Sequence, residues 1–156
     1  MMKAKHVNRW LTLGANFGVL VGIILLLVEL DQNSTMMRAQ TRNEVSQGIV
    51  DLMSLSANNE QLASLIRRAD IGEELTADEY LQFQHRSFAL FRYLENLHYQ
   101  YRQGLFDEAE FATQREAWKL YLNYSKAAVT VWCLYRPTVS LEFRTEIDSV
   151  LNRYRC

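Results

Sequence analysis

Glu95 and His98 have a spacing that metal-binding helices use. An E-x-x-H pair lies on one helix face in the di-iron carboxylate bundles, which combine two such pairs with two further acidic residues. The other histidines, His6 and His85, are not placed to form a second pair. We therefore expect no bound metal and no cofactor, and we interpret His98 as a histidine of the protein core.

Cys133 and Cys156 are the two cysteines of the chain, and they allow three interpretations. Cys133 has no histidine near it in the sequence, so nothing supports a nucleophilic role, and it can be a small buried apolar residue instead. The two thiols can also form a disulfide in an oxidising compartment. The chain has no G-x-S-x-G sequence, phosphate-binding loop or zinc-ligand spacing, so we predict that it is not an enzyme.

A group of polar side chains lies within residues 76–104, which have the pattern of a central helix. Its members are Arg92, Glu95, Asn96, His98, Tyr99, Gln100 and Tyr101. We expect this helix to be largely buried, and buried polar groups need hydrogen-bond partners. We predict a polar network that fixes helix packing. The alternative is a polar–aromatic pocket for a small ligand around Arg92, Glu95 and Tyr99.

Composition indicates which elements carry these residues. The chain has 156 residues, with 17 basic and 18 acidic side chains and a single proline. Leu, Glu, Gln, Arg and Ala are abundant after residue 35, which favours helix throughout. No long basic block follows the apolar N-terminal segment, so nucleic acid is not an expected partner.

Residues 10–28 carry no charge. As a helix they span roughly 28 Å, close to the hydrocarbon thickness of a bilayer. A buried soluble helix would show a polar face, and a cleaved signal peptide would have a shorter apolar run and a small-residue cleavage site. We therefore predict a basic cytoplasmic tail at residues 1–9, a transmembrane helix at residues 10–30 and an extramembrane helical domain at residues 31–156.

Charges on the two sides of the apolar segment indicate its orientation. Lys3, Lys5 and Arg9 precede it, whereas Glu29 and Asp31 follow it. Basic flanks stay preferentially in the cytoplasm. We expect a single-pass protein of the bacterial inner membrane, with a cytoplasmic N-terminus and a periplasmic C-terminal domain.

Three glycines four residues apart mark one face of the membrane helix. Gly14, Gly18 and Gly22 share a stripe, and Leu25 and Glu29 continue it at about 100° per residue. Glycine allows two membrane helices to approach closely, and an acidic group at the membrane edge favours a partner's donor over lipid. We predict a helix–helix interface on this stripe. The alternative is chance, because glycine is common in membrane helices.

The domain beyond the membrane is expected to be a small bundle with a central αα-hairpin. Thr76 and Glu79 form a capping box for the central helix, and Gly104 suits the left-handed position at its end. Asp107 and Glu110 form a second box, which predicts a tight turn between antiparallel helices. The predicted fold class is all-α, with an N-terminal transmembrane helix continuing into a small helical bundle.

Two stretches of the chain resemble a family of uncharacterised bacterial single-pass membrane proteins. They are VELDQNSTMMRAQT, residues 28–41, and FRYLENLHYQYRQGLFDEAEF, residues 91–111. The resemblance covers most of the chain in the same order. It implies an anchored helical domain with no established activity, and therefore no catalytic residue.

These observations favour a non-enzymatic single-pass membrane protein that acts as a homo-oligomer or as an accessory subunit of a membrane complex. Its expected partners are membrane lipid and protein, either other copies of itself or subunits of that complex. The alternative is a small-ligand sensor or carrier that uses the polar–aromatic pocket.

Overall fold

Every regular element in the described part of the chain is helical, which confirms the predicted all-α class. The computed structural model describes residues 2–156, with side chains from His6 onward. The elements are α1 (Met2–Ala57), α2 (Glu60–Asp70), α3 (Ala77–Arg102), α4 (Glu108–Tyr124), α5 (Lys126–Tyr135), the 3₁₀ helix η1 (Arg136–Thr138) and α6 (Leu141–Val150). Met1 and the side chains of Lys3 and Lys5, which belong to the predicted cytoplasmic tail, lie outside the described residues.

Helix α1 carries the apolar segment and continues without a break into the following domain, as predicted. The chain divides into two compact units, Met1–Gln40 and Thr41–Cys156, so the last turns of α1 belong to the second unit. Residues 9 and 30, where the sequence suggests boundaries, are changes in composition within one helix and not ends of secondary structure.

Helix starts in the second unit follow the capping residues of the sequence. Thr76 and Glu79 form the predicted box: the Thr76 hydroxyl accepts from the Glu79 N–H, and the Glu79 carboxylate accepts from the Thr76 N–H at 2.9 Å. Asp107 caps α4 as predicted, accepting from an N–H of the first turn at 2.8 Å. The second predicted capping box is wrong in one of its two hydrogen bonds, the one from the Asp107 N–H to the Glu110 carboxylate. The carboxylate of Glu110 pairs with Arg42 of α1 at 3.0 Å instead.

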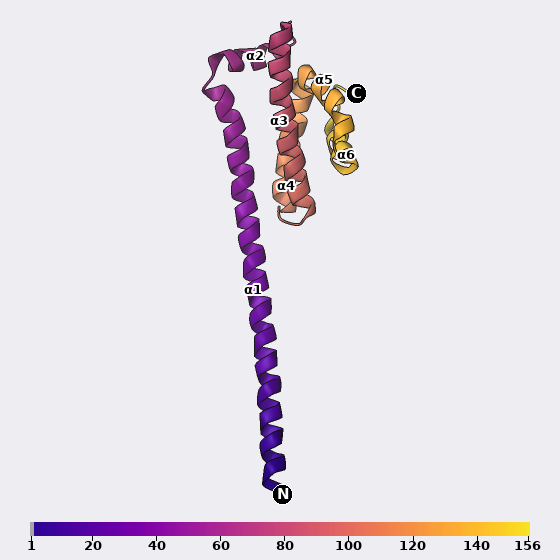
Figure 1. Ribbon diagram of the computed structural model, residues 1–156. Helices are drawn as coiled ribbons and strands as arrows, with labels where there is room; N and C mark the ends of the chain where they lie inside the picture. Colours follow the sequence, from indigo (N-terminus) through magenta and orange to yellow (C-terminus); the bar gives the residue numbers. More distant parts are fainter. Residues whose placement is uncertain (1) are drawn as a thin grey trace. The chain divides into compact units, whose positions relative to one another are not determined.

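Two glycines end helices in the left-handed conformation. Gly72 follows α2 with a φ of 83°, and Gly104 follows α3 with a φ of 71°. After α3, the Leu105 N–H donates to the Gln100 carbonyl at 3.1 Å and the Gly104 N–H to the Tyr101 carbonyl at 2.9 Å, which is the Schellman pattern. The tight turn predicted here is confirmed, and it returns α4 antiparallel to α3 (Figure 1).

The core of the second unit is aromatic and centres on α3. This helix contacts α2, α4, α5 and α6 (Figure 1). Phe83 and Phe91 of α3 are fully buried. Trp132 of α5 packs against Phe91 and against Phe143 of α6, with ring centroids 5.2 and 5.7 Å apart. The core therefore lies around the middle of α3, and the other helices are assembled on it.

The last turns of α1 pack against α3 at a glycine. A Cβ on Gly48 would lie 3.3 Å from two ring atoms of Tyr93. The Tyr93 hydroxyl donates to the carbonyl of Val45 at 3.1 Å, and Val45 and Leu52 are buried. The missing side chain of Gly48 thus allows the Tyr93 ring to lie against the α1 backbone.

Candidate functional site

The apolar segment of α1 is uncovered within the described chain. Among residues 2–156, α1 is the one helix long and apolar enough to cross a membrane, and none of its most apolar window is buried. At Gly14, Gly18 and Gly22 an added Cβ would meet no atom within 4 Å, and Leu25 and Glu29 are exposed. All five predicted interface residues are therefore open to lipid or to a second helix.

The polar residues of α3 do not form one buried network. Glu95, Gln100 and Tyr101 are half-buried, and His98 is buried. The prediction of burial is wrong for three others, which are exposed: Arg92, Asn96 and Tyr99. Successive members of these three are four and three residues apart, so they share one helix face, which is turned away from the core.

Two of the half-buried members, Tyr101 and Glu95, make separate local contacts. The Tyr101 hydroxyl donates to Glu108, which raises the pKa of Tyr101. Glu95 pairs with Arg92 at 2.5 Å and accepts from the Ser140 N–H at 3.4 Å. Glu108 begins α4 and Ser140 caps α6, so these contacts fasten the first turns of two neighbouring helices to α3.

His98 lies in the core, as predicted. It is 6% exposed and packs against the rings of Phe111 and Phe143, with centroids 5.9 and 5.8 Å away. Burial lowers the pKa of His98, which favours the neutral imidazole. Glu95 is engaged by Arg92, and within residues 6–156 no three His, Cys, Asp or Glu side chains converge to hold a metal.

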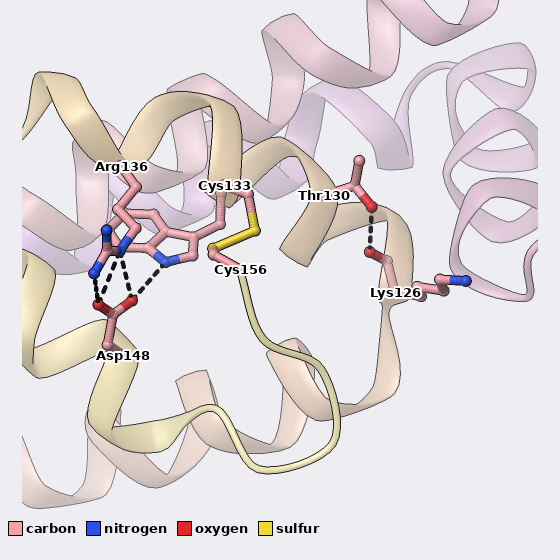
Figure 2. Close-up of a disulfide and its surroundings, with 7 residues drawn as sticks. Lys126, Thr130, Cys133, Arg136, Asp148 and Cys156 are labelled. Carbon is pink, nitrogen blue, oxygen red and sulfur yellow. Dashed lines mark hydrogen bonds and ion pairs between the residues drawn. A yellow bond between two sulfur atoms is a disulfide. The ribbon is translucent and has the colours of Figure 1, made fainter.

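Cys133 and Cys156 form a disulfide, with Cα atoms 5.2 Å apart (Figure 2). The segment after α6 reaches Cys133 of α5 because Asn123 of α4 holds it. The Asn123 side-chain oxygen accepts from the N–H groups of Asn152 and Arg153 at 2.8 and 2.7 Å. Among the interpretations of the two thiols, the structure thus contains the disulfide.

A charged cluster lies beside the disulfide (Figure 2). Asp148 of α6 accepts from Trp132 Nε1 at 3.1 Å and from Arg136 Nη2 at 2.6 Å. Partial burial opposes ionisation of Asp148, but the hydrogen bonds from Arg136 and Trp132 outweigh it and lower the pKa of this carboxyl. These hydrogen bonds pair the polar groups of the cluster, and the cluster connects α5 and η1 to α6.

A cavity of about 270 Å³ lies between three elements: the last turns of α1, helix α3 and helix α4. All of its lining residues belong to the second unit. We call it the α1–α3–α4 groove. Most of its wall is apolar and comes from Ile49, Leu52, Met53, Leu90, Leu94 and Ala117. Its polar lining residues are Arg86, Tyr93, Gln114, Trp118 and Tyr121.

Two hydrogen-bond donors among the groove residues have no acceptor in the described chain. One is Nε1 of Trp118, a side chain that is only 4% exposed, and the other is Nε of the half-buried Arg86. Arg86 Nη1 donates to the Tyr121 hydroxyl at 3.0 Å, and the guanidinium lies 5.8 Å from the Tyr121 ring centroid. Buried donors are nearly always satisfied in native proteins, so these two are exceptions that require an explanation.

The charge of Arg86 is also not matched by an ion pair. Asp70 of α2 interacts with Arg86 electrostatically, but no described carboxylate lies within ion-pair distance of the guanidinium. Burial raises the pKa of Asp70, whereas the hydrogen bond with Ser125 and the charge of Arg86 act to lower it. Burial likewise raises the pKa of Tyr121. The groove therefore contains a guanidinium that forms no ion pair and whose Nε has no acceptor in the described chain.

The sequence contains one local signal for this groove. Arg86 precedes Leu90 by four residues and Tyr93 by seven, so a charged residue occupies the stripe of α3 that faces inward. Trp118 and Tyr121 have the helical spacing of ordinary core residues, so nothing in the sequence distinguishes them. The three walls come from distant segments, and no local pattern predicts that they meet.

The chain matches no protein-family model. No curated protein matches it either. No solved structure matches it. The resemblance carried by residues 28–41 and 91–111 stays a prediction, and the function is argued from the residues of the chain itself.

Proposed function

We propose that this chain is a non-enzymatic single-pass membrane protein that acts as a homo-oligomer or as an accessory subunit of a membrane complex. The uncovered apolar segment of α1 carries the proposal, because no part of the described chain buries its most apolar window. Exposed apolar surface costs about 25 cal/mol per Å² in water. A helix of this length removes that cost by spanning a bilayer.

Two observations support a cytoplasmic N-terminus and a periplasmic domain in a bacterial inner membrane. Basic residues precede the apolar segment and acidic residues follow it. The disulfide between Cys133 and Cys156 is a bond that persists in oxidising compartments such as the periplasm. A reporter that is active only in the cytoplasm should be inactive when fused after Cys156, and activity there would contradict this orientation.

The candidate catalytic groups support a role in binding rather than in catalysis. Cys133 is bound in the disulfide, His98 is buried between aromatic rings, and Glu95 is paired with Arg92. The alternative of a ligand pocket around Arg92, Glu95 and Tyr99 has less support, because the side chains of Arg92 and Tyr99 lie on the exposed face of α3.

The open glycine stripe supports association through the membrane helix. Lipid provides little hydrophobic drive between helices, so close packing and hydrogen bonds carry their association. Glu29 lies at the end of the apolar segment, where it can accept from Gln32 or Asn33 of another copy. Such a polar contact contributes roughly 0.6–2 kcal/mol, which tunes assembly without creating it.

The test compares three variants of the full chain by crosslinking in membranes. Gly18→Ile should weaken association strongly, because it blocks close approach. Apart from the neighbouring backbone of its own helix, a Cβ on Gly18 would meet no atom within 4 Å, so it contacts no side chain of the described chain. Glu29→Gln should weaken association mildly, and Ile23→Leu on another face serves as the matched control. If Gly18→Ile associates as well as the parent, the segment is a plain anchor.

A further inference from the structure

We propose that the α1–α3–α4 groove binds a small carboxylate with an apolar body, and that Arg86 holds its carboxylate group. The proposal concerns the domain outside the membrane and is independent of association through the membrane helix. It rests on three properties of the groove: unsatisfied donors, an unmatched positive charge, and a limited volume with apolar walls.

The unsatisfied donors require an acceptor. Trp118 is almost fully buried and lines the groove, yet its Nε1 has no partner. Nε of Arg86, on the facing helix α3, is also buried without a hydrogen-bond partner. Both nitrogens are buried, so a ligand oxygen pairs with one of them only when the Arg86 or Trp118 side chain turns toward the groove. Leaving a buried donor unpaired costs more than an average hydrogen bond gains, and this cost favours that movement.

The charge selects an anion among possible acceptors. Arg86 uses Nη1 for the hydroxyl of Tyr121, and its planar guanidinium can still donate two parallel hydrogen bonds, the geometry that suits a carboxylate. Asp70 interacts with this charge electrostatically but forms no ion pair with Arg86, and its own Oδ1 has no hydrogen-bond partner in the described chain. Partial burial strengthens the attraction between a bound carboxylate and the guanidinium.

Volume and wall chemistry define the rest of the ligand. The cavity of about 270 Å³ corresponds to the volume of about nine water molecules. A molecule of about ten heavy atoms fits, whereas a two-chain membrane lipid does not. Leu52, Leu90 and Leu94 line the walls, so the part of the ligand beyond its carboxylate is apolar. Octanoate combines these properties and is soluble enough to serve as a probe.

The experiment is calorimetric titration of the full chain in phosphatidylcholine nanodiscs. The heat measured with empty nanodiscs is subtracted. Octanoate should bind once per chain. Octan-1-ol, which has the same body without charge, should bind about tenfold more weakly or worse, the ratio that a charge-assisted hydrogen bond produces. Octylammonium should not bind. An absence of saturable octanoate binding, or equal binding of octanoate and octan-1-ol, overturns the proposal.

Two variants locate the site. Arg86→Gln should weaken octanoate binding about tenfold or more and leave octan-1-ol unchanged. Ala117→Phe should block both probes, because it adds a ring at an exposed position of the groove wall. Arg67→Gln is the matched control, since Arg67 is an exposed arginine of α2 outside the groove, and it should bind like the parent.

Folding of each variant is checked by thermal unfolding. If Arg86→Gln does not fold, Ala117→Phe decides the question: loss of octanoate binding at native-like stability supports the site, and unchanged binding overturns it. If Arg86→Gln folds and binds octanoate like the parent, Arg86 has only a structural role and the proposal is wrong.

Discussion

Gly104 offers a test of how backbone conformation determines the α3–α4 hairpin. Its φ is 71°, and a Cβ placed on it would meet no atom within 4 Å. The Cβ itself has room, so we expect the loss of stability on substitution to come mainly from the left-handed backbone. That conformation costs roughly 1–2 kcal/mol for a residue with a Cβ, and asparagine tolerates it better than other non-glycine residues. We expect stability to fall in the order Gly, Asn, Ala, Val.

The assay is thermal unfolding of the full chain in nanodiscs, with near-ultraviolet circular dichroism as the signal that is monitored. For a unit of this size, 1–2 kcal/mol lowers the melting temperature by roughly 4–8 °C. Ala89→Val is the matched control, because it adds a branched side chain at an exposed helical position of α3 and should cost less than about 0.7 kcal/mol. A Gly104→Val protein that melts like the parent would refute the reasoning, as would Asn performing no better than Val.

Three further predictions concern the core and the disulfide. Reduction of the bond between Cys133 and Cys156, which are 23 residues apart, should destabilise the domain by roughly 3 kcal/mol, read as a lower denaturant midpoint; an unchanged midpoint in reductant would contradict this. Burial lowers the pKa of His98 below its ordinary 6.5, so its contribution to stability is complete above about pH 6.5 and is lost as the pH falls toward the lower folded value. His98→Asn should flatten that part of the stability–pH curve, and an unaltered curve would show that another group is responsible. Purified protein should contain no stoichiometric iron, zinc or manganese; about one metal per chain, lost in the double variant with Glu95→Ala and His98→Ala, would revive an enzymatic interpretation.

Helix boundaries are the features that local sequence predicts best. Thr76, Glu79 and Asp107 act within one turn of their own position, so their chemistry identifies the helix starts without knowledge of the fold. Gly104 is similar, since the left-handed position and its two hydrogen bonds involve only adjacent residues. Local sequence does not predict the partner of Glu110, because its carboxylate forms an ion pair with Arg42, a residue distant in the sequence.

The polar residues of α3 show a different kind of error. Arg92, Asn96 and Tyr99 are close to His98 in the sequence, and this proximity is the basis for predicting one buried group. Helical periodicity separates them, since His98 shares the inward stripe with Leu94 and the other three share the outward one. The sequence therefore contains this information, because the position of each residue on a helix face predicts which side chains are buried.

The α1–α3–α4 groove could not be predicted in this way. Its walls come from three helices, and its shape depends on how Gly48 allows Tyr93 to lie against α1, a contact between residues far apart in the chain. Arg86 departs from what a packed core requires, because it places a charge on an inward stripe. Departures from local consistency are expected where a protein has a function to serve. In this chain that departure coincides with the unpaired donors of Arg86 and Trp118, which is why the groove, rather than the polar face of α3, is the place to look for a ligand.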